Sequence, residues 1–220
     1  MHAGQKLAIV GISGAGKTTI FNLLLRLHEP TAGSIRIDGH DLRDLELDSY
    51  LDSVGVVLQE NFLFSSSIRD NILFGNIHAT EDDLNDAVER AGLWPTIGAS
   101  AEGLDTILLE GGNLSMGQKQ RIGIARALIR DPRFLMLDEA TSLLDPMTEE
   151  SILRQLAELE AGRTRLVIAH HFNSIEDADE ILVMEEGKCV QRGRHADLIT
   201  VNGPYKSLWA TERRRHLDAT

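Results

Sequence analysis

The sequence has one cysteine, few aromatic residues, no long apolar run and no excess of positive charge. Cys189 has no partner for an internal disulfide, which fits a reducing compartment. No apolar stretch reaches the roughly 20 residues that span a bilayer, and the N-terminus lacks the pattern of a secretory signal. Lysine and arginine number 22 against 34 aspartates and glutamates, a net charge of −12. Because neutralising phosphates needs a basic face, we expect no nucleic-acid partner, and we expect the chain itself to be soluble.

Short apolar runs alternate with segments of helical spacing along the 220 residues. This alternation predicts an α/β fold with buried, largely parallel strands. The predicted strands are Lys6–Val10, Val54–Leu58, Phe134–Leu137, Arg165–Ala169 and Glu180–Met184, with possible edge strands at Ser34–Asp38 and Lys188–Arg192. The predicted helices are Lys17–Leu27, Glu81–Ala91, Gly117–Ile129 and Thr148–Leu159. Residues 60–130 contain no convincing strand, which indicates a helical insertion in the α/β core.

The stretch "GISGAGKTT", residues 11–19, follows the first apolar run and matches the phosphate-loop pattern G-x-x-x-x-G-K-[ST]. Its glycines let successive backbone N–H groups turn inward around phosphate oxygens, and the helix starting near Lys17 adds its positive end. Lys17 would reach the β- and γ-phosphates, and the Thr18 hydroxyl would coordinate Mg²⁺. The loop is therefore predicted to bind a nucleoside triphosphate rather than to be a bare glycine turn. The expected nucleotide contacts are Gly11, Ser13, Gly14, Ala15, Gly16, Lys17, Thr18 and Thr19.

Hydrolysis needs further acidic groups, and "FLMLDE", residues 134–139, supplies them. Asp138 ends a predicted central strand and would hold Mg²⁺. Glu139 follows at once and could orient and polarise the attacking water. The simpler alternative, a strand that ends in two solvated acids, is weakened by the phosphate loop earlier in the chain.

Between these motifs lies "LSMGQKQR", residues 114–121, which resembles the signature motif LSGGQ of ATP-binding cassette (ABC) proteins. Ser115 is a natural N-cap for the helix that follows it. The resemblance implies that Ser115, Gly117 and Gln118 face the γ-phosphate of an ATP molecule bound to a second, opposite ABC domain. Met116 departs from the motif, where glycine is usual.

Further motifs follow in the order of the same family. In "VVLQE", residues 56–60, a predicted strand ends with Gln59. This residue is similar to the family's glutamine that contacts Mg²⁺ or the attacking water. "SLLD" places Asp145 where the family has a loop at the dimer interface, and "VIAHH" places His170 where a switch histidine contacts the γ-phosphate. The likeness covers nearly the whole chain. It implies a P-loop core over 1–59 and 131–220, a helical subdomain over 60–130 and a reduced antiparallel β part.

The stretch "ENFLFSSSIRDNILFG", residues 60–75, resembles the exporter branch of the family, as does the C-terminal part of the chain. The resemblance implies an ATPase that works as a homodimer or heterodimer of ABC domains and drives the transmembrane domains of an exporter. Its place would be the cytoplasmic face of a membrane, the inner membrane in a bacterium. "EGLDTILLEGG", residues 102–112, is similar to the loop that exporters set against their coupling helices.

Family members carry an adenine-stacking aromatic residue well before the phosphate loop, but only ten residues precede Gly11. The chain is therefore expected to be truncated relative to the family domain. Base stacking on an aromatic side chain contributes ~1–3 kcal/mol, so ATP affinity is expected to be lower by roughly five- to 150-fold. Two alternatives stay open at this point: a soluble ABC-type clamp for DNA repair or translation, and a nucleotide-binding module with little turnover.

Overall fold

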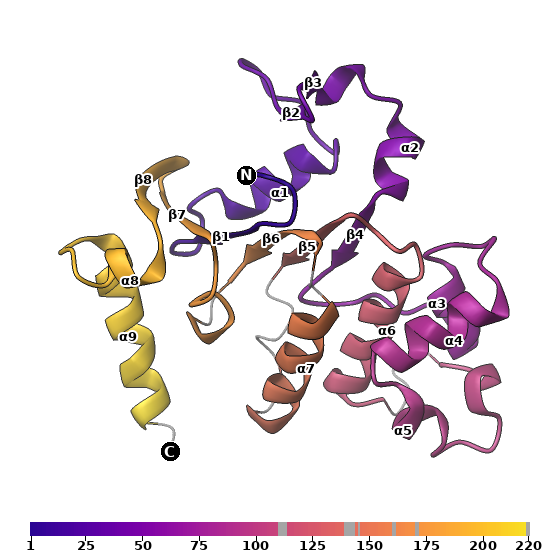
Figure 1. Ribbon diagram of the computed structural model, residues 1–220. Helices are drawn as coiled ribbons and strands as arrows, with labels where there is room; N and C mark the ends of the chain where they lie inside the picture. The colour runs from indigo at the N-terminus through magenta and orange to yellow at the C-terminus, as the bar shows by residue number, and fades with distance from the viewer. Residues whose placement is uncertain (110–113, 139–143, 145, 160–161, 170–171, 219–220) are drawn as a thin grey trace. The chain divides into compact units, whose positions relative to one another are not determined.

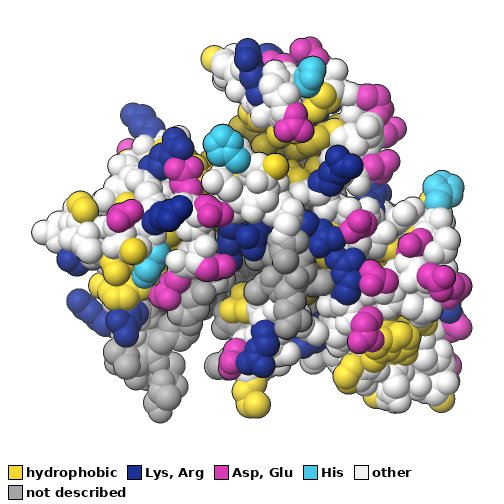
Figure 2. Space-filling model, in the orientation of Figure 1, with side chains coloured by type: hydrophobic (Ala, Val, Ile, Leu, Met, Phe, Trp, Pro, Cys, Tyr) yellow, Lys and Arg dark blue, Asp and Glu magenta, His cyan; other side chains and the backbone are white. Residues whose placement is uncertain are grey.

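The structure is a computed structural model that describes residues 1–109, 114–138, 144, 146–159, 162–169 and 172–218. The chain divides into two compact units. Residues 1–51 and 165–220 form the first, and residues 52–164 form the second. The helical subdomain expected over 60–130 falls inside the second unit, and its boundaries stay a prediction. Acidic side chains are spread over much of the visible surface, in keeping with the net charge of −12 (Figure 2).

The first unit is built on β1 (Lys6–Val10), which lies between β6 (Thr164–Ile168) and β7 (Glu180–Glu185) and is parallel to both. β1 is almost entirely buried, because strands flank it on both edges and its residues Leu7–Val10 are a continuous apolar run. β8 (Lys188–Gly193) pairs with β7 in an antiparallel hairpin. The other elements of this unit are α1 (Lys17–Leu24), β2 (Arg36–Ile37), β3 (His40–Asp41), α2 (Leu47–Asp52, ending at the unit boundary), α8 (His195–Leu198) and α9 (Pro204–Asp218).

The second unit contains the parallel strands β4 (Val54–Val57) and β5 (Phe134–Asp138). Its helices are α3 (Ile68–Leu73), α4 (Glu81–Arg90), α5 (Trp94–Ile97), α6 (Met116–Leu128) and α7 (Pro146–Leu159). Helices α3, α4 and α6 pack on one another as a helical group (Figure 1). This group has an apolar core, which includes Ile68, Ile72, Leu84, Ile122 and Ile124.

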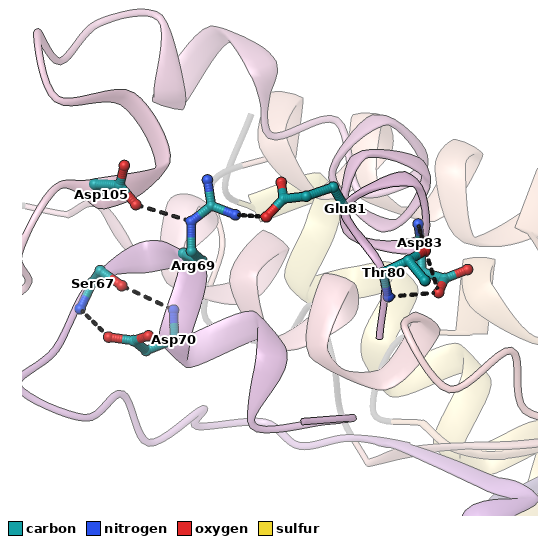
Figure 3. Close-up of polar contacts among 7 residues, drawn as sticks. All are labelled: Ser67, Arg69, Asp70, Thr80, Glu81, Asp83 and Asp105. Atoms are coloured by element: carbon teal, nitrogen blue, oxygen red, sulfur yellow. Dashed lines mark hydrogen bonds and ion pairs between the residues drawn. The ribbon is translucent and has the colours of Figure 1, made fainter. Parts of the chain in front are cut away.

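Helices α3 and α4 begin at reciprocal caps (Figure 3). The Asp70 N–H donates to Ser67 Oγ at 2.9 Å, and the Ser67 N–H donates back to the Asp70 carboxylate. Thr80 and Asp83 form the same capping box at α4. Each box satisfies N–H groups that a helix start leaves without an intrahelical partner. These capping boxes thus fix the residues at which α3 and α4 begin.

The predicted α/β class with largely parallel strands is confirmed, together with a small antiparallel part. Most predicted elements match the observed ones to within one or two residues at each end, but two elements are clearly shorter than expected. The helix expected over Lys17–Leu27 ends at Leu24, because the backbone turns into a left-handed conformation at Arg26, with φ 55°. The edge strand expected over Ser34–Asp38 shrinks to Arg36–Ile37, which pairs only with β3 in a separate two-stranded hairpin. Among the described residues, none of the helices is long and apolar enough to cross a membrane.

Candidate functional site

The predicted phosphate loop connects β1 to α1 in the first unit. β1 ends at Val10 and α1 begins at Lys17, so the loop has the strand–turn–helix context that the motif requires. Gly14 and Gly16 have φ values of 79° and 97°, a left-handed conformation that glycine adopts without a steric cost. Ser13, Gly14 and Thr18 are exposed, whereas Ala15 is buried beneath the turn. The loop therefore exposes Ser13 and Gly14 at its tip.

The phosphate loop packs against the β7–β8 hairpin. A Cβ placed on Gly11 would overlap the carbonyl oxygen of Met184 at the end of β7. The Gly187 N–H in the hairpin turn donates to the Ala15 carbonyl at 3.1 Å. Glycine at position 11 thus lets the loop lie directly on the neighbouring strand, which fixes its shape.

The side chain of Lys17 lies within the loop and is only 6% exposed. Its Nζ donates to the carbonyl oxygens of Gly11 and Ile12 at 2.8 and 3.2 Å. These contacts place a buried positive charge beside the backbone N–H groups of the turn. Because the ammonium group is already held in the loop, Lys17 would need little rearrangement to contact a bound anion.

The N-terminus of α1 differs from those of α3, α4 and α6. Each of those three helices has a capping box that satisfies its first N–H groups. No side chain caps α1, and its first turn has no acidic residue. The positive end of a helix without a competing carboxylate is suited to a phosphate group.

A cavity of about 810 Å³ lies beside the first half of the loop. Its lining includes Gly11, Ile12 and Ser13 together with Phe172 and Glu212, but not Gly14–Thr18. Both carboxylate oxygens of Glu212, on α9, accept the Phe172 N–H, at 3.0 and 3.1 Å. Helix α9 thus contacts the segment that follows β6. Of the predicted nucleotide contacts, the cavity is therefore lined by Gly11 and Ser13 only.

In the second unit, Gln59 and Asp138 lie at the same end of a pair of parallel strands. Val57 of β4 lies opposite Leu137 of β5. Asp138 follows Leu137 directly, Gln59 is two residues past Val57, and both side chains are half-buried. The carboxyl ends of parallel strands are where ligands bind in open α/β sheets. Two of the residues predicted to contact Mg²⁺ therefore follow the same end of adjacent strands.

The signature segment begins helix α6, as the sequence predicts. Ser115 is its N-cap: the Gln118 N–H donates to Ser115 Oγ at 3.2 Å, and the Ser115 N–H donates to Gln118 Oε1 at 2.8 Å. A Cβ on Gly117 would lie 2.5 Å from Thr148 Cγ2, so glycine permits close packing of α6 against α7. Met116 is 42% exposed at the first turn.

Three predicted site residues, Glu139, Asp145 and His170, lie outside the described residues. Sequence reasoning also missed a residue near Gln59. Gln120, on α6, is only 4% exposed; its amide donates to the Leu58 carbonyl at 3.2 Å and accepts from Asn61 at 2.8 Å. The helical spacing of Gln120 with the buried residues Gly117, Gly123 and Ile124 was the signal that could have revealed it.

A family model described as "ABC transporter" matches residues 1–142. The "Uncharacterized ABC transporter ATP-binding protein YfiC" of Bacillus subtilis is 44% identical over 96% of this chain and 35% of its own length. The "Iron-sulfur clusters transporter ABCB7, mitochondrial" of Danio rerio is 45% identical over 98% of this chain and 29% of its own length.

Among solved structures, "Structure of a bacterial Atm1-family ABC exporter with ATP bound" is similar with a TM-score of 0.89 and 40% identity, over 96% of this chain and 37% of that one. The chain spans 19% to 36% of the length of these and other curated relatives that it matches.

Proposed function

The chain belongs to the ABC transporter family, and from that premise we propose that it binds and hydrolyses ATP to power an exporter. The observation that carries this proposal is the phosphate loop with its uncapped helix. Lys17 is buried within the loop, and the first turn of α1 offers N–H groups with no acidic neighbour. Phosphate groups fit this arrangement of one positive charge and a helix N-terminus.

The residues that the sequence motifs assign to Mg²⁺ carry oxygen donors of the kind that this ion binds, one in the first unit and two in the second. Thr18 is exposed in the first turn of α1, and Gln59 and Asp138 follow adjacent strand ends. Hydroxyl, amide and carboxylate oxygens are the hard ligands that this ion prefers. When bound, Mg²⁺ would neutralise charge on the β- and γ-phosphates.

In the proposed reaction, water attacks the γ-phosphorus, the bond to the β–γ bridging oxygen breaks, and ADP and inorganic phosphate leave. Glu139 orients the water and, as the general base, accepts the proton that the water loses as it attacks. Lys17 and the loop N–H groups stabilise charge on the phosphate oxygens. His170 contacts the γ-phosphate. These roles rest on the motifs and on the loop geometry of the first unit.

We further propose that two such domains bind two ATP molecules head to tail. Ser115, Gly117 and Gln118 at the start of α6 would face the γ-phosphate bound to the second domain, and Asp145 would lie at the shared interface. Ser115 and Met116 at the start of α6 are exposed and the first turn has no acidic residue, which supports this proposal because a helix start without a carboxylate is suited to an anion. The helical subdomain over 60–130 would carry this surface.

An exposed aromatic patch, formed by Phe62, Phe64 and Phe74, supports the exporter interpretation. These side chains are 71%, 37% and 59% exposed, and the ring of Phe64 lies 5.2 Å from that of Phe62 and 4.6 Å from that of Phe74. A cluster of exposed aromatic rings marks an interaction surface. We propose that the aromatic patch contacts the transmembrane domains of the exporter at the cytoplasmic face of the membrane. The relatives named above are transporters by name, which favours an exporter over a soluble clamp.

The order of nucleotide affinities tests the binding step. A loop that contacts the β- and γ-phosphates should bind Mg-ATP and Mg-ADP far more tightly than AMP, which lacks both phosphates. Titration calorimetry with the three nucleotides measures this order, and release of inorganic phosphate from ATP measures turnover. Equal affinity for AMP and ATP would contradict phosphate recognition by the loop. Tight ATP binding without phosphate release would point to the nucleotide-binding module instead.

A further inference from the structure

Helix α6 contacts the segment 58–75 along one of its faces. Gln120, Gly123 and Arg126 recur every three residues and therefore line this face, and Arg130 follows two residues past the end of the helix. Gln120 binds the Leu58 carbonyl, a Cβ on Gly123 would overlap Asn61, and Arg130 donates to the Gly75 carbonyl. The segment that carries the aromatic patch is thus attached to the helix that begins at the signature motif.

Arg126 makes the most extensive of these contacts. Its Nε donates to the Asn71 carbonyl at 2.8 Å and its Nη2 to Asn71 Oδ1 at 2.9 Å. Its Nη1 donates to the Phe62 carbonyl at 2.8 Å. The guanidinium also lies 5.7 Å from the ring centre of Phe64 and 5.8 Å from that of Phe74, within the range of a cation–π interaction. One side chain therefore contacts every member of the aromatic patch.

Asn71 completes this arrangement from α3. It is fully buried, and its Oδ1 accepts the Phe64 N–H at 2.9 Å in addition to the bond from Arg126. Its Nδ2 donates to the carbonyls of Phe64 and Ser67, each at 3.0 Å, and to Ser66 Oγ at 3.1 Å. The backbone that displays Phe62 and Phe64 is thus folded around one amide, and Arg126 connects this amide to α6.

The arrangement requires a guanidinium. Three donors point to three acceptors while the flat face lies beside two rings, and a lysine ammonium has neither the fork nor the plane. Burial lowers the pKa of Arg126, but an arginine stays charged in proteins, so the positive charge beside the rings is retained.

We propose that Arg126 is a positioning residue that couples the aromatic patch to helix α6. Nucleotide contact at Ser115 then changes the position and the stability of the segment that carries the patch. The inference rests on the proposed function, because it takes Ser115 to meet ATP. A helix transmits such a displacement along its length as a rigid element. The coupling is reciprocal: a partner that binds the patch alters the affinity of the Ser115 end for nucleotide by the same factor.

Hydrogen exchange measured by mass spectrometry distinguishes this coupling from a purely structural role. The Phe64 and Ser66 amides are reporters, since both donate within the patch segment. Exchange is followed with and without Mg-ATP in a Glu139→Gln background, which keeps ATP intact. Two further variants are compared in that background, Arg126→Gln and Arg126→Lys. Arg126→Lys keeps the positive charge but lacks the guanidinium group, and it provides the test if Arg126→Gln does not fold.

Arg69→Gln provides a matched control. Arg69 lies on α3 within the same segment and bonds to Glu81 and to Asp105, the latter at 2.9 Å (Figure 3). It is a partly buried arginine with two ion-pair partners, neither of which lies on α6. Replacing Arg69 therefore perturbs the segment but leaves the contacts of Arg126 between α6 and the aromatic patch in place.

Without nucleotide, both Arg126 variants should raise exchange at the reporter amides by roughly tenfold, because hydrogen bonds to a charged group are lost. Mg-ATP should slow exchange at residues 11–19 in every variant. It should slow the reporter amides in the background and in Arg69→Gln, but not in either Arg126 variant.

Retained ATP protection of the reporters in Arg126→Gln, or its equal loss in Arg69→Gln, would overturn the coupling. So would reporters that do not respond to ATP in the background although residues 11–19 do. Failure of the proposed function looks different, because Mg-ATP would then protect neither the reporters nor residues 11–19.

Discussion

Replacing Lys17 with alanine should remove most of the ATP affinity. The wild-type ammonium is buried in the loop and already held by the carbonyls of Gly11 and Ile12. Each hydrogen bond between a charged donor and a phosphate oxygen contributes about 1.5–3 kcal/mol, so the loss of even one weakens binding by roughly ten- to 150-fold. The alanine variant also leaves the phosphates without their nearest positive charge. Titration calorimetry with Mg-ATP measures the change in Kd.

Lys6 offers a matched control for this experiment. It is also 6% exposed and lies in the same unit, but its Nζ donates to the carboxylate of Asp177 at 2.7 Å, in an ion pair away from the loop. Lys6→Ala should lower the thermal stability while the folded protein keeps its ATP affinity. If Lys17→Ala bound ATP as tightly as the parent, the loop would not be the phosphate site. An equal loss of affinity in both variants would indicate general damage instead.

Glu139→Gln should stop turnover and leave ATP binding largely intact. Glutamine has nearly the same shape as glutamate, but its neutral amide does not polarise or deprotonate water. A positioned general base contributes about 10²–10⁴-fold to a rate, and the variant should lose a factor of this order. Release of inorganic phosphate at saturating ATP measures turnover, and calorimetry on the same preparation measures binding. Hydrolysis at the parent rate would show that Glu139 does not have the proposed role.

The strands were predictable because each is a short apolar run with a polar end. Phe134–Leu137 is an example: the observed β5 differs from the prediction only by including Asp138. The phosphate loop was equally visible, since its glycines and Lys17 are adjacent in sequence. The cap at Ser115 was also predicted correctly, because its partner Gln118 is only three residues away. Features of this kind can be predicted because the residues that form them are close together in the sequence.

Helix α3 was not predicted, because it has only six residues and follows a run of serines that reads as a loop. Its stability comes from the Ser67–Asp70 capping box and from the burial of Ile68 and Ile72, which depends on the rest of the unit.

The contact between Arg126 and Asn71 was hidden for a related reason. These residues are 55 positions apart, and each is an ordinary polar side chain until the fold brings them together. The roles of Glu139, Asp145 and His170 stay predictions, because these residues lie outside the described part of the chain.

The central claim is that ATP joins two of these domains through the start of α6. Without nucleotide, two chains of net charge −12 repel each other, so the protein should sediment as a monomer. Bound ATP supplies the negative group that the positive end of α6 is suited to meet. Ser115→Arg in the Glu139→Gln background blocks this surface and removes the cap, so it should stay monomeric.

Analytical ultracentrifugation of Glu139→Gln with and without saturating Mg-ATP tests this claim most directly. The account predicts a monomer without nucleotide, a dimer with Mg-ATP, and a monomer throughout for the Ser115→Arg double variant. A Glu139→Gln protein that binds ATP by calorimetry yet sediments as a monomer under both conditions would contradict it.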